Sequence, residues 1–240
     1  MPPTESEFLA EINADLPPGV DWKQGAVTYL RELVLDGGDQ EWYHLTKPFV
    51  GGPDFDPFWV DVFHFLDVIH TMDLPSNSRA LDVGCGPGWT IQWLAKLGHE
   101  VIGLDISQEL LDIAEQRMQT DPYHPYPPYR GRPFAYELRN HDIEAEPVGL
   151  DEPVFLALFE STLHHFENPV AALRNVARDL APAGALAVIE AAAPNPGTEW
   201  HTRNLEIMNR YHTIERPSPE SSSTTCSNWP VTGGASSSVR

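Results

Sequence analysis

Three glycines lie within five positions directly after a short apolar run, in the stretch ALDVGCGPGWT of residues 80–90. They are Gly84, Gly86 and Gly88, and Asp82 comes just before the first of them. Glycine is needed where φ is positive or where a side chain would collide with a bound molecule. A glycine loop between a strand and a helix also turns backbone N–H groups and the positive helix end towards a ligand. The stretch is therefore either an ordinary tight turn or a place where backbone meets a ligand.

The spacing of the glycines argues against a dinucleotide site. A dinucleotide loop has the pattern G-x-G-x-x-G, whereas here the third glycine falls one position early and Trp89 follows it. A carboxylate at Asp82 suits a ligand that carries a cation better than one that carries a pyrophosphate, because like charges repel. A nicotinamide-dependent oxidoreductase is therefore the less favoured alternative.

More polar residues that could bind or react follow the later apolar runs. Asp105 ends the run EVIGLD, and a carboxylate there can accept strong hydrogen bonds from two hydroxyl groups. Glu160, His164 and His165 follow the run PVFLALF, and histidine has a suitable unperturbed pKa for removing a proton. The pair Asp142-Ile143 combines a hydrogen-bond acceptor with an apolar contact.

Alternating apolar runs and helical stripes place these residues on a parallel α/β sheet. The runs predict strands over 79–83, 100–105, 133–138, 153–159 and 185–191. Helices are predicted over 89–97, from the capping residue Ser107 to about 118, and from Asn168 to Ala183-Gly184. The last of these helices should bury a stripe of Val170, Leu173, Val176 and Leu180. In an open parallel sheet, ligands bind at the carboxyl ends of the strands, which is where the polar residues fall.

The remaining segments differ in composition from this region. Residues 1–75 predict a helical N-terminal cap, with helices over about 20–35 and 57–72 and many aromatic residues, among them Tyr43. The proline-rich stretch 121–133 cannot be a regular helix. It could line the binding site of a substrate or be a solvent loop. A sheet domain is predicted over 76–216, with a helix over about 199–214. The Ser/Thr/Gly-rich tail 217–240 is predicted to be disordered or aberrant, as after a frameshift or truncation.

Charge and cysteine content exclude several classes of function. The chain has 240 residues and a formal net charge of −20, which disfavours nucleic acid and anionic membrane surfaces as partners. Cys85 and Cys226 form neither a disulfide framework nor a zinc-type pair, so no metal site is expected. The N-terminus lacks the features of a signal peptide and no apolar stretch approaches a membrane span, so we expect a cytoplasmic protein.

The segment D-V-G-C-G-P-G, from Asp82 to Gly88, resembles the first motif of the class I S-adenosylmethionine-dependent methyltransferases of the small-molecule type. Asp105, the pair Asp142-Ile143 and the segment ESTLHHFENP resemble later features of that family, and the resemblance covers about residues 75–195. It implies a Rossmann-like fold with a mostly parallel sheet whose terminal strand pair is here missing or disordered. It also implies S-adenosyl-L-methionine as cofactor, S-adenosyl-L-homocysteine as product and a small-molecule methyl acceptor.

The resemblance assigns roles to particular residues. It implies that Asp105 holds the ribose hydroxyls, that Asp142 accepts a hydrogen bond from the adenine amino group and that Ile143 contacts the adenine ring. The expected cofactor-binding residues are Asp82, Gly84, Cys85, Gly86, Gly88, Asp105, Ile106, Asp142, Ile143, Glu160 and Tyr43. The candidates for catalysis are Glu160, His164 and His165, and no metal ligand is expected.

Structural roles remain open for several of these positions. Asp82 could hold the loop backbone, Asp142 could be a surface residue, and Cys85 is better explained as a small packed residue than as a nucleophile. The histidines and Glu160 could position the cofactor instead of moving a proton. The unusual tail leaves open a protein that binds the cofactor without turnover. A nucleic-acid methyltransferase is disfavoured by charge and by the lack of an N-P-P-Y-type or D-P-P-Y-type motif at Glu160.

Overall fold

The computed structural model describes residues 56–121 and 134–189, with the single positions Thr4, Ser6, Glu7, Ala10 and Lys23. The chain divides into two compact units, one of residues 21–190 and one of residues 1–20 and 191–240. In the second unit, Thr4 and Glu7 form a reciprocal capping box, with the Thr4 N–H donating to Glu7 Oε2 at 2.7 Å. The unit of residues 21–190 carries the sheet.

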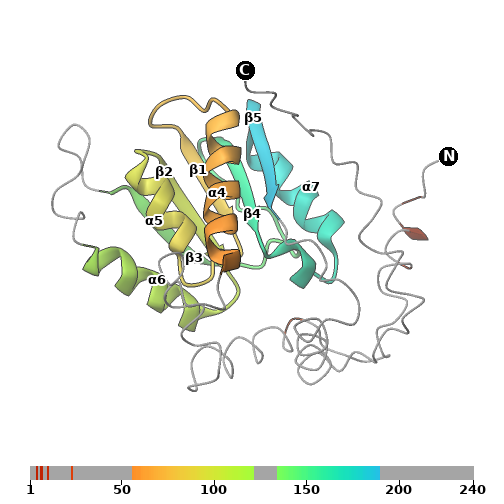
Figure 1. Ribbon diagram of the computed structural model, residues 1–240. Helices are drawn as coiled ribbons and strands as arrows, with labels where there is room; N and C mark the ends of the chain where they lie inside the picture. Colours follow the sequence, from red (N-terminus) through yellow and green to blue (C-terminus); the bar gives the residue numbers. More distant parts are fainter. Residues whose placement is uncertain are drawn as a thin grey trace. The chain divides into compact units, whose positions relative to one another are not determined.

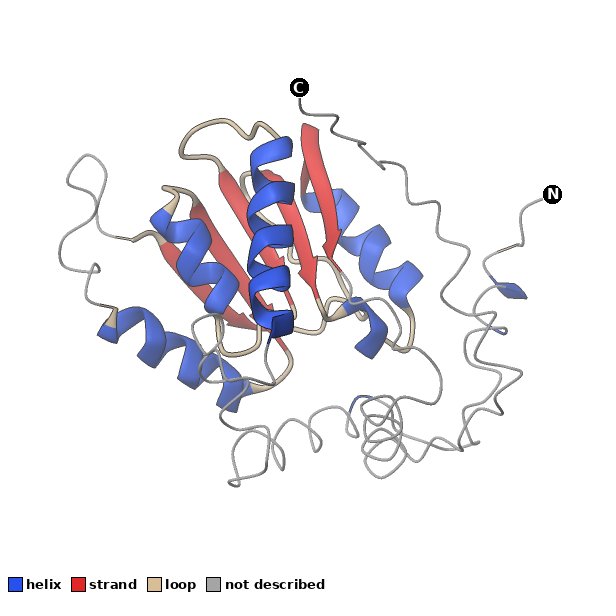
Figure 2. Ribbon diagram, viewed as in Figure 1, coloured by secondary structure: helices blue, strands red, loops and turns tan. Residues whose placement is uncertain are grey.

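The described residues of that unit form a five-stranded parallel sheet in the order β3-β2-β1-β4-β5. Figure 2 shows the strands side by side with helices around them. The strands are β1 (Arg79–Val83), β2 (Glu100–Asp105), β3 (Tyr136–Asn140), β4 (Val154–Glu160) and β5 (Leu180–Ile189). The helices are α4 (Asp56–Thr71), α5 (Trp89–Lys96), α6 (Gln108–Thr120) and α7 (Pro169–Asp179), with a short 3₁₀ turn η2 (Leu163–His165).

The central strands β1, β2 and β4 are buried between helices on both faces of the sheet, as their apolar sequences require, whereas β3 and β5 are partly exposed. On one face, side chains of α4, α5 and α6 join the sheet in one core cluster that includes Phe65, Ile91 and Met118. On the other face, Ala172 and Val176 of α7 pack on Leu81 and neighbouring residues. Figure 1 shows α4 and α5 crossing the same face of the sheet. The helices between β1, β2 and β3 thus lie on one face, and α7 covers the other.

Strand register brings the glycine loop and two carboxylates to the carboxyl end of the sheet. Val83 of β1 pairs with Leu104 of β2 and with Phe159 of β4. The residues that follow these three are Gly84, Asp105 and Glu160, so all three stand at the same level at the carboxyl end of the sheet. The α/β fold class predicted from the sequence is confirmed, and the strands 79–83 and 100–105 have the predicted bounds.

The helix caps that position this edge also follow the sequence. Ser107 caps α6 by accepting a hydrogen bond from the Leu110 N–H at 3.3 Å, as predicted. Asn168 caps α7 by accepting one from the Ala171 N–H at 2.9 Å, and Pro169 occupies the first helical position.

Two strand predictions are wrong at their boundaries. The strand predicted over 133–138 is Tyr136–Asn140 in the structure, because its bounds come from pairing with β2, whereas its own residues are largely half-buried and give a weak pattern. The strand predicted over 185–191 begins earlier, at Leu180, and is described as far as Ile189, since residues 190 and 191 lie outside the described residues; its pairing with β4 contains a register shift. A shifted pairing depends on the partner strand, so the apolar run alone does not reveal it.

The predicted core stripe of α7 is also partly wrong. The buried residues of α7 include Asn175 and Asp179, whereas Val170 and Leu173 are only half-buried. The reason is polar: Asp179 accepts hydrogen bonds from the N–H groups of Val148 and Leu150, both at 3.0 Å. The helix ends at Asp179, before the predicted Ala183-Gly184, because β5 begins at the next residue.

Several predictions fall on residues outside the described ones. They concern the helices over 20–35 and 199–214, the proline-rich stretch and the tail 217–240, including the missing strand pair. The helix predicted over 57–72 is confirmed as α4 and packs on the sheet through Val62, Phe65 and Ile69. The boundary at residue 75 stays a prediction. None of the described helices has the length and hydrophobicity that a membrane span requires.

Candidate active site at the carboxyl end of the sheet

The glycine loop joins β1 to α5 with left-handed backbone at each glycine. The φ angles of Gly84, Gly86 and Gly88 are +68°, +52° and +78°. The N–H groups of Gly84 and Cys85 both donate to the Leu104 carbonyl, at 2.8 and 2.9 Å. These bonds attach the loop to β2 at the level of Asp105.

The three glycines differ in what surrounds them. A Cβ at Gly84 would overlap the hydroxyl group of Thr162, and one at Gly88 would lie 2.8 Å from the Ala114 Cβ of α6. These two glycines permit close packing within the protein. Among the described residues, a Cβ at Gly86 would meet nothing within 4 Å, so the backbone there borders space that they leave open. Of the three, Gly86 therefore has the geometry expected where a ligand approaches the main chain.

Asp105 ends β2 and connects the strand to the glycine loop. Its Oδ2 accepts a hydrogen bond from the Gly86 N–H at 2.9 Å, and its Oδ1 accepts one from the Ser107 N–H at 2.8 Å. Burial raises the pKa of Asp105 to about 6, although the backbone N–H donors oppose the shift. The Ile106 N–H also donates to this carboxylate. Since an ionised carboxylate has about four acceptor sites, Asp105 keeps capacity for one further donor.

Asp82 lies beneath the loop with a side chain enclosed by protein. The residue is 1% exposed, and Oδ2 accepts a hydrogen bond from the Thr90 hydroxyl group. Burial, helped by the nearby charges of Glu160 and Asp105, raises the pKa of Asp82 to about 7, although the Thr90 hydrogen bond opposes the shift. A cation placed beside Asp82 would favour its ionised form.

Glu160 ends β4, and donors from two directions hold its carboxylate. The Trp89 indole N–H donates to Oε2 at 3.3 Å, and the Ser161 hydroxyl group donates to Oε1 at 2.9 Å. Trp89 is itself buried against Phe65 of α4, with ring centroids 5.3 Å apart. Helix α4 therefore supports the Trp89 ring that holds Glu160.

One donor to each of the three carboxylates comes from a single short stretch, residues 86–90. Gly86 binds Asp105, Trp89 binds Glu160 and Thr90 binds Asp82. The ends of β1, β2 and β4 thus hold the loop and the first turn of α5 from three sides. The sequence marked the carboxylates as candidates, but it gave no role to Trp89 or Thr90. Their position directly after the third glycine was the available signal.

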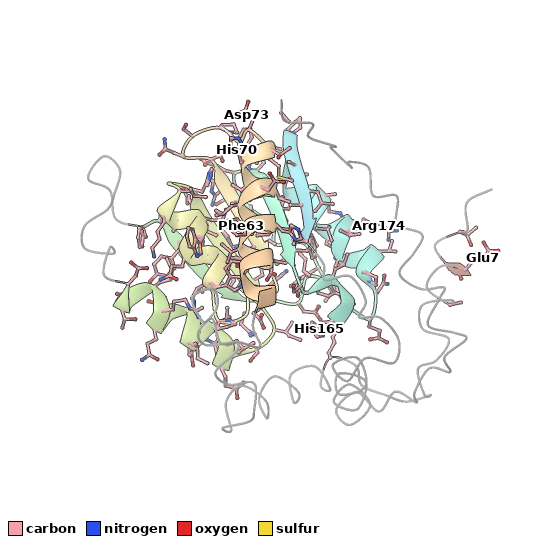
Figure 3. The ribbon with its side chains drawn as sticks, in the orientation of Figure 1. Glu7, Phe63, His70, Asp73, His165 and Arg174 are labelled. Carbon is pink, nitrogen blue, oxygen red and sulfur yellow. The ribbon has the colours of Figure 1, made fainter. Side chains whose placement is uncertain are left out.

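The candidate histidines follow Glu160 in a tight turn. Ser161 has a φ of +51°, uncommon for a residue other than glycine, and its N–H donates to the Ile189 carbonyl at 2.7 Å. Figure 3 shows His165 beyond the end of β4, on the turn η2. The backbone of His164 belongs to the same turn, and its side chain lies outside the described part of the structure.

The adenine-side candidates lie after β3. Asp142 Oδ1 accepts hydrogen bonds from the N–H groups of Glu144 and Ala145, and Oδ2 forms an ion pair with Lys23 Nζ at 2.5 Å. The Ile143 side chain is buried in the core cluster under α7. Lys23 is 119 residues from Asp142, and no sequence pattern connected the two.

Three further site candidates complete the set. Cys85 is buried in the core cluster, and burial raises the pKa of its thiol, which fits a packed residue. Ile106 is half-buried, and its carbonyl accepts a hydrogen bond from Asn140 Nδ2 at 2.9 Å. Tyr43 lies outside the described residues. Across the described parts of the chain, no group of three or more His, Cys, Asp or Glu side chains is arranged to hold a metal ion.

Comparison with known proteins places this site in a family. Residues 81–188 match the family described as "Methyltransferase domain". Over these residues the chain is similar to methyltransferases, as the resemblance seen in the sequence implies. The match confirms the resemblance for this part of the chain. The matched region contains the glycine loop and all three carboxylates.

Methyltransferases occur among the similar proteins. The demethylmenaquinone methyltransferase of Staphylococcus saprophyticus is 27% identical over 130 residues, 53% of this chain and 50% of that protein. The ubiquinone biosynthesis O-methyltransferase of Xanthomonas oryzae is 32% identical over 117 residues, 46% of this chain and 42% of that protein. The chain spans half or less of the length of these relatives.

A solved structure shares the fold. The [4+2]-cyclase SpnF superposes with a TM-score of 0.54 at 21% sequence identity, covering 77% of this chain and 65% of that one. This similarity concerns the fold alone, because one fold can support different reactions.

Proposed function

We propose that the protein transfers the methyl group of S-adenosylmethionine to a small-molecule acceptor. The observation that carries the proposal is the bond between the Gly86 N–H and Asp105, at a glycine whose missing side chain leaves open space. The loop that a ligand can approach and the carboxylate that can accept a hydrogen bond from its hydroxyl groups thus form one hydrogen-bonded unit. This arrangement fits the ribose and amino-acid portions of the cofactor.

In this proposal, each carboxylate binds a different part of the cofactor. Asp105 accepts a hydrogen bond from the ribose hydroxyl groups, and Asp82 balances the charge of the ammonium group. Asp142 accepts a hydrogen bond from the adenine amino group, and Ile143 provides the apolar contact. The contributions of Tyr43, Cys85 and Ile106 are part of the same proposal.

The cofactor supplies an activated methyl group, so alignment contributes much of the rate. The acceptor atom forms a bond to the methyl carbon while the carbon–sulfur bond breaks and its electron pair stays on sulfur, giving S-adenosylhomocysteine. If the acceptor carries a proton, a base must take it. Glu160, held by Trp89 and Ser161, is a candidate for this step, as are His164 and His165.

A small-molecule acceptor is supported by charge and by the relatives. A net charge of −20 opposes binding to a phosphate backbone. The relatives named for demethylmenaquinone methylation and ubiquinone biosynthesis indicate aromatic, quinone-like acceptors as the first compounds to screen. A soluble enzyme in the cytoplasm suits this chemistry.

The test combines cofactor binding with methyl transfer. Asp105→Ala should weaken S-adenosylhomocysteine binding by about 2 kcal/mol, because it removes a hydrogen bond to a charged acceptor. Calorimetric titration measures this, with Asp151→Ala at an exposed aspartate as the matched control. Transfer of labelled methyl from S-adenosylmethionine to phenolic and quinol acceptors then tests turnover. Equal affinity in Asp105→Ala would contradict the ribose assignment.

A second reading is a protein that binds the cofactor without methyl transfer. One observation favours it: the Ser/Thr/Gly-rich composition of residues 217–240 departs from that of the sheet region. Tight S-adenosylhomocysteine binding together with no methyl transfer to any acceptor would support this reading over turnover.

A further inference from the structure

We propose that Lys23 is a positioning residue for adenine recognition, acting from outside the matched methyltransferase region by holding Asp142 and Glu144 in place. The inference rests on the proposed cofactor site. Lys23 Nζ lies 2.5 Å from Asp142 Oδ2 and 3.6 Å from Glu144 Oε2. One ammonium group thus bridges two carboxylates that are two residues apart.

The charges of this cluster are mutually dependent. Partial burial alone would lower the pKa of Lys23, but its contacts with Asp142 and Glu144 outweigh burial and raise it. Burial likewise acts to raise the pKa of Asp142, yet Lys23 and the backbone donors lower it overall. The side chains of Lys23 and Asp142 are each about one-third exposed, whereas that of Glu144 is 7% exposed. Without Lys23, two neighbouring carboxylates would repel each other, one of them buried.

The turn that carries Asp142 is otherwise tied to α7. Glu144 Oε1 accepts a hydrogen bond from the Asn168 N–H at 2.5 Å, and Asn175 Nδ2 donates to the Ile143 carbonyl at 2.8 Å. These bonds hold the side of the turn that faces the helix. Lys23 is the described cation on the Asp142 side, so it fixes the carboxylate that α7 does not reach.

The hydrogen bonds of Asp142 leave limited acceptor capacity. Oδ1 already accepts from the N–H groups of Glu144 and Ala145, and Oδ2 binds Lys23. An ionised carboxylate has about four acceptor sites, so one remains on Oδ2. Lys23 therefore keeps Asp142 ionised and oriented while leaving a place for one amino hydrogen.

Two ligands that differ at the adenine amino group test the idea. S-inosyl-L-homocysteine carries a carbonyl oxygen where S-adenosylhomocysteine carries that amino group. In calorimetric titrations, Lys23→Met should weaken S-adenosylhomocysteine binding about tenfold, the size of one lost charged hydrogen bond. Binding of the inosyl ligand should change much less, so the preference for adenine falls. Lys23→Arg should restore part of it, and Asp142→Asn should lose the same preference.

A matched control separates positioning from stability. Lys96 forms an ion pair at 2.7 Å with the buried Asp121, between α5 and the end of α6. Lys96→Met should lower the unfolding temperature and leave the adenine preference unchanged. An unchanged preference in a folded Lys23→Met variant would overturn the inference. A wild-type protein that binds neither ligand would instead contradict the proposed function, and the inference with it.

Discussion

At the scale of a single residue, the environment of Asp82 disfavours the ionised form of its carboxyl group. Its pKa is about 7 in the folded protein, against an ordinary value of 3.8. The folded protein therefore keeps a proton that the unfolded chain releases. Asp82 thus contributes stability that is complete below pH 3.8 and declines as the pH rises to about 7.

The pH dependence gives a test at this residue. Asp82→Asn keeps a side-chain oxygen that can accept the Thr90 hydrogen bond. The asparagine side chain cannot ionise. The variant should gain in unfolding free energy over the wild type by up to about 1.4 kcal/mol per pH unit between pH 5 and 7, with little further change to pH 8. Urea unfolding across this range measures the difference. A difference that stays constant with pH would contradict the assignment of the buried carboxyl.

At the scale of elements, the glycine loop combines packing with binding. Gly84 and Gly88 lie against Thr162 and Ala114, whereas Gly86 borders open space. The loop therefore needs glycine for two separate reasons, and substitution can distinguish them. Gly149, in the loop before β4, provides a comparison, because its φ is +68° and a Cβ there would also meet nothing within 4 Å.

Gly86→Ala and Gly149→Ala should lower the unfolding free energy by similar amounts, about 1 kcal/mol each, because both place alanine in left-handed backbone. Only Gly86→Ala should weaken S-adenosylhomocysteine binding, by at least about tenfold, since its new methyl group occupies the space proposed for the ligand. Chemical unfolding and calorimetric titration of both variants provide the two measurements. Equal affinity in the two variants would show that the open space at Gly86 is not used by the cofactor.

The sequence predicted this level of structure where local signals were strong. The strands β1 and β2 and the caps Ser107 and Asn168 have unambiguous patterns, and the structure confirms them. The buried face of α7 was predicted incorrectly because hydrophobicity says nothing of an Asp179 side chain that binds loop backbone. The contact between Trp89 and Glu160 depends on tertiary packing, and the sequence signalled it only through the position of Trp89 directly after the third glycine.

At the scale of the whole molecule, the matched methyltransferase domain and the fold limit the possible functions without identifying a methyl acceptor. The matched region covers residues 81–188, and the similarity to a cyclase concerns fold alone. The role of Lys23 could not be predicted either, since the residue lies far from the motifs in sequence. The glycine loop and the carboxyl ends of β1, β2 and β4 bear most directly on which cofactor the protein binds.

Thermal unfolding with S-adenosylhomocysteine, and with NAD in parallel, tests that property most directly. A ligand at about 100 times its dissociation constant adds roughly 2.7 kcal/mol to stability. For a protein of this size, that corresponds to an increase of about 5–10 °C in unfolding temperature. We predict this increase with S-adenosylhomocysteine and none with NAD. An increase in unfolding temperature with NAD alone would contradict the account of the site. So would the absence of any increase with either ligand in a sample that unfolds cooperatively.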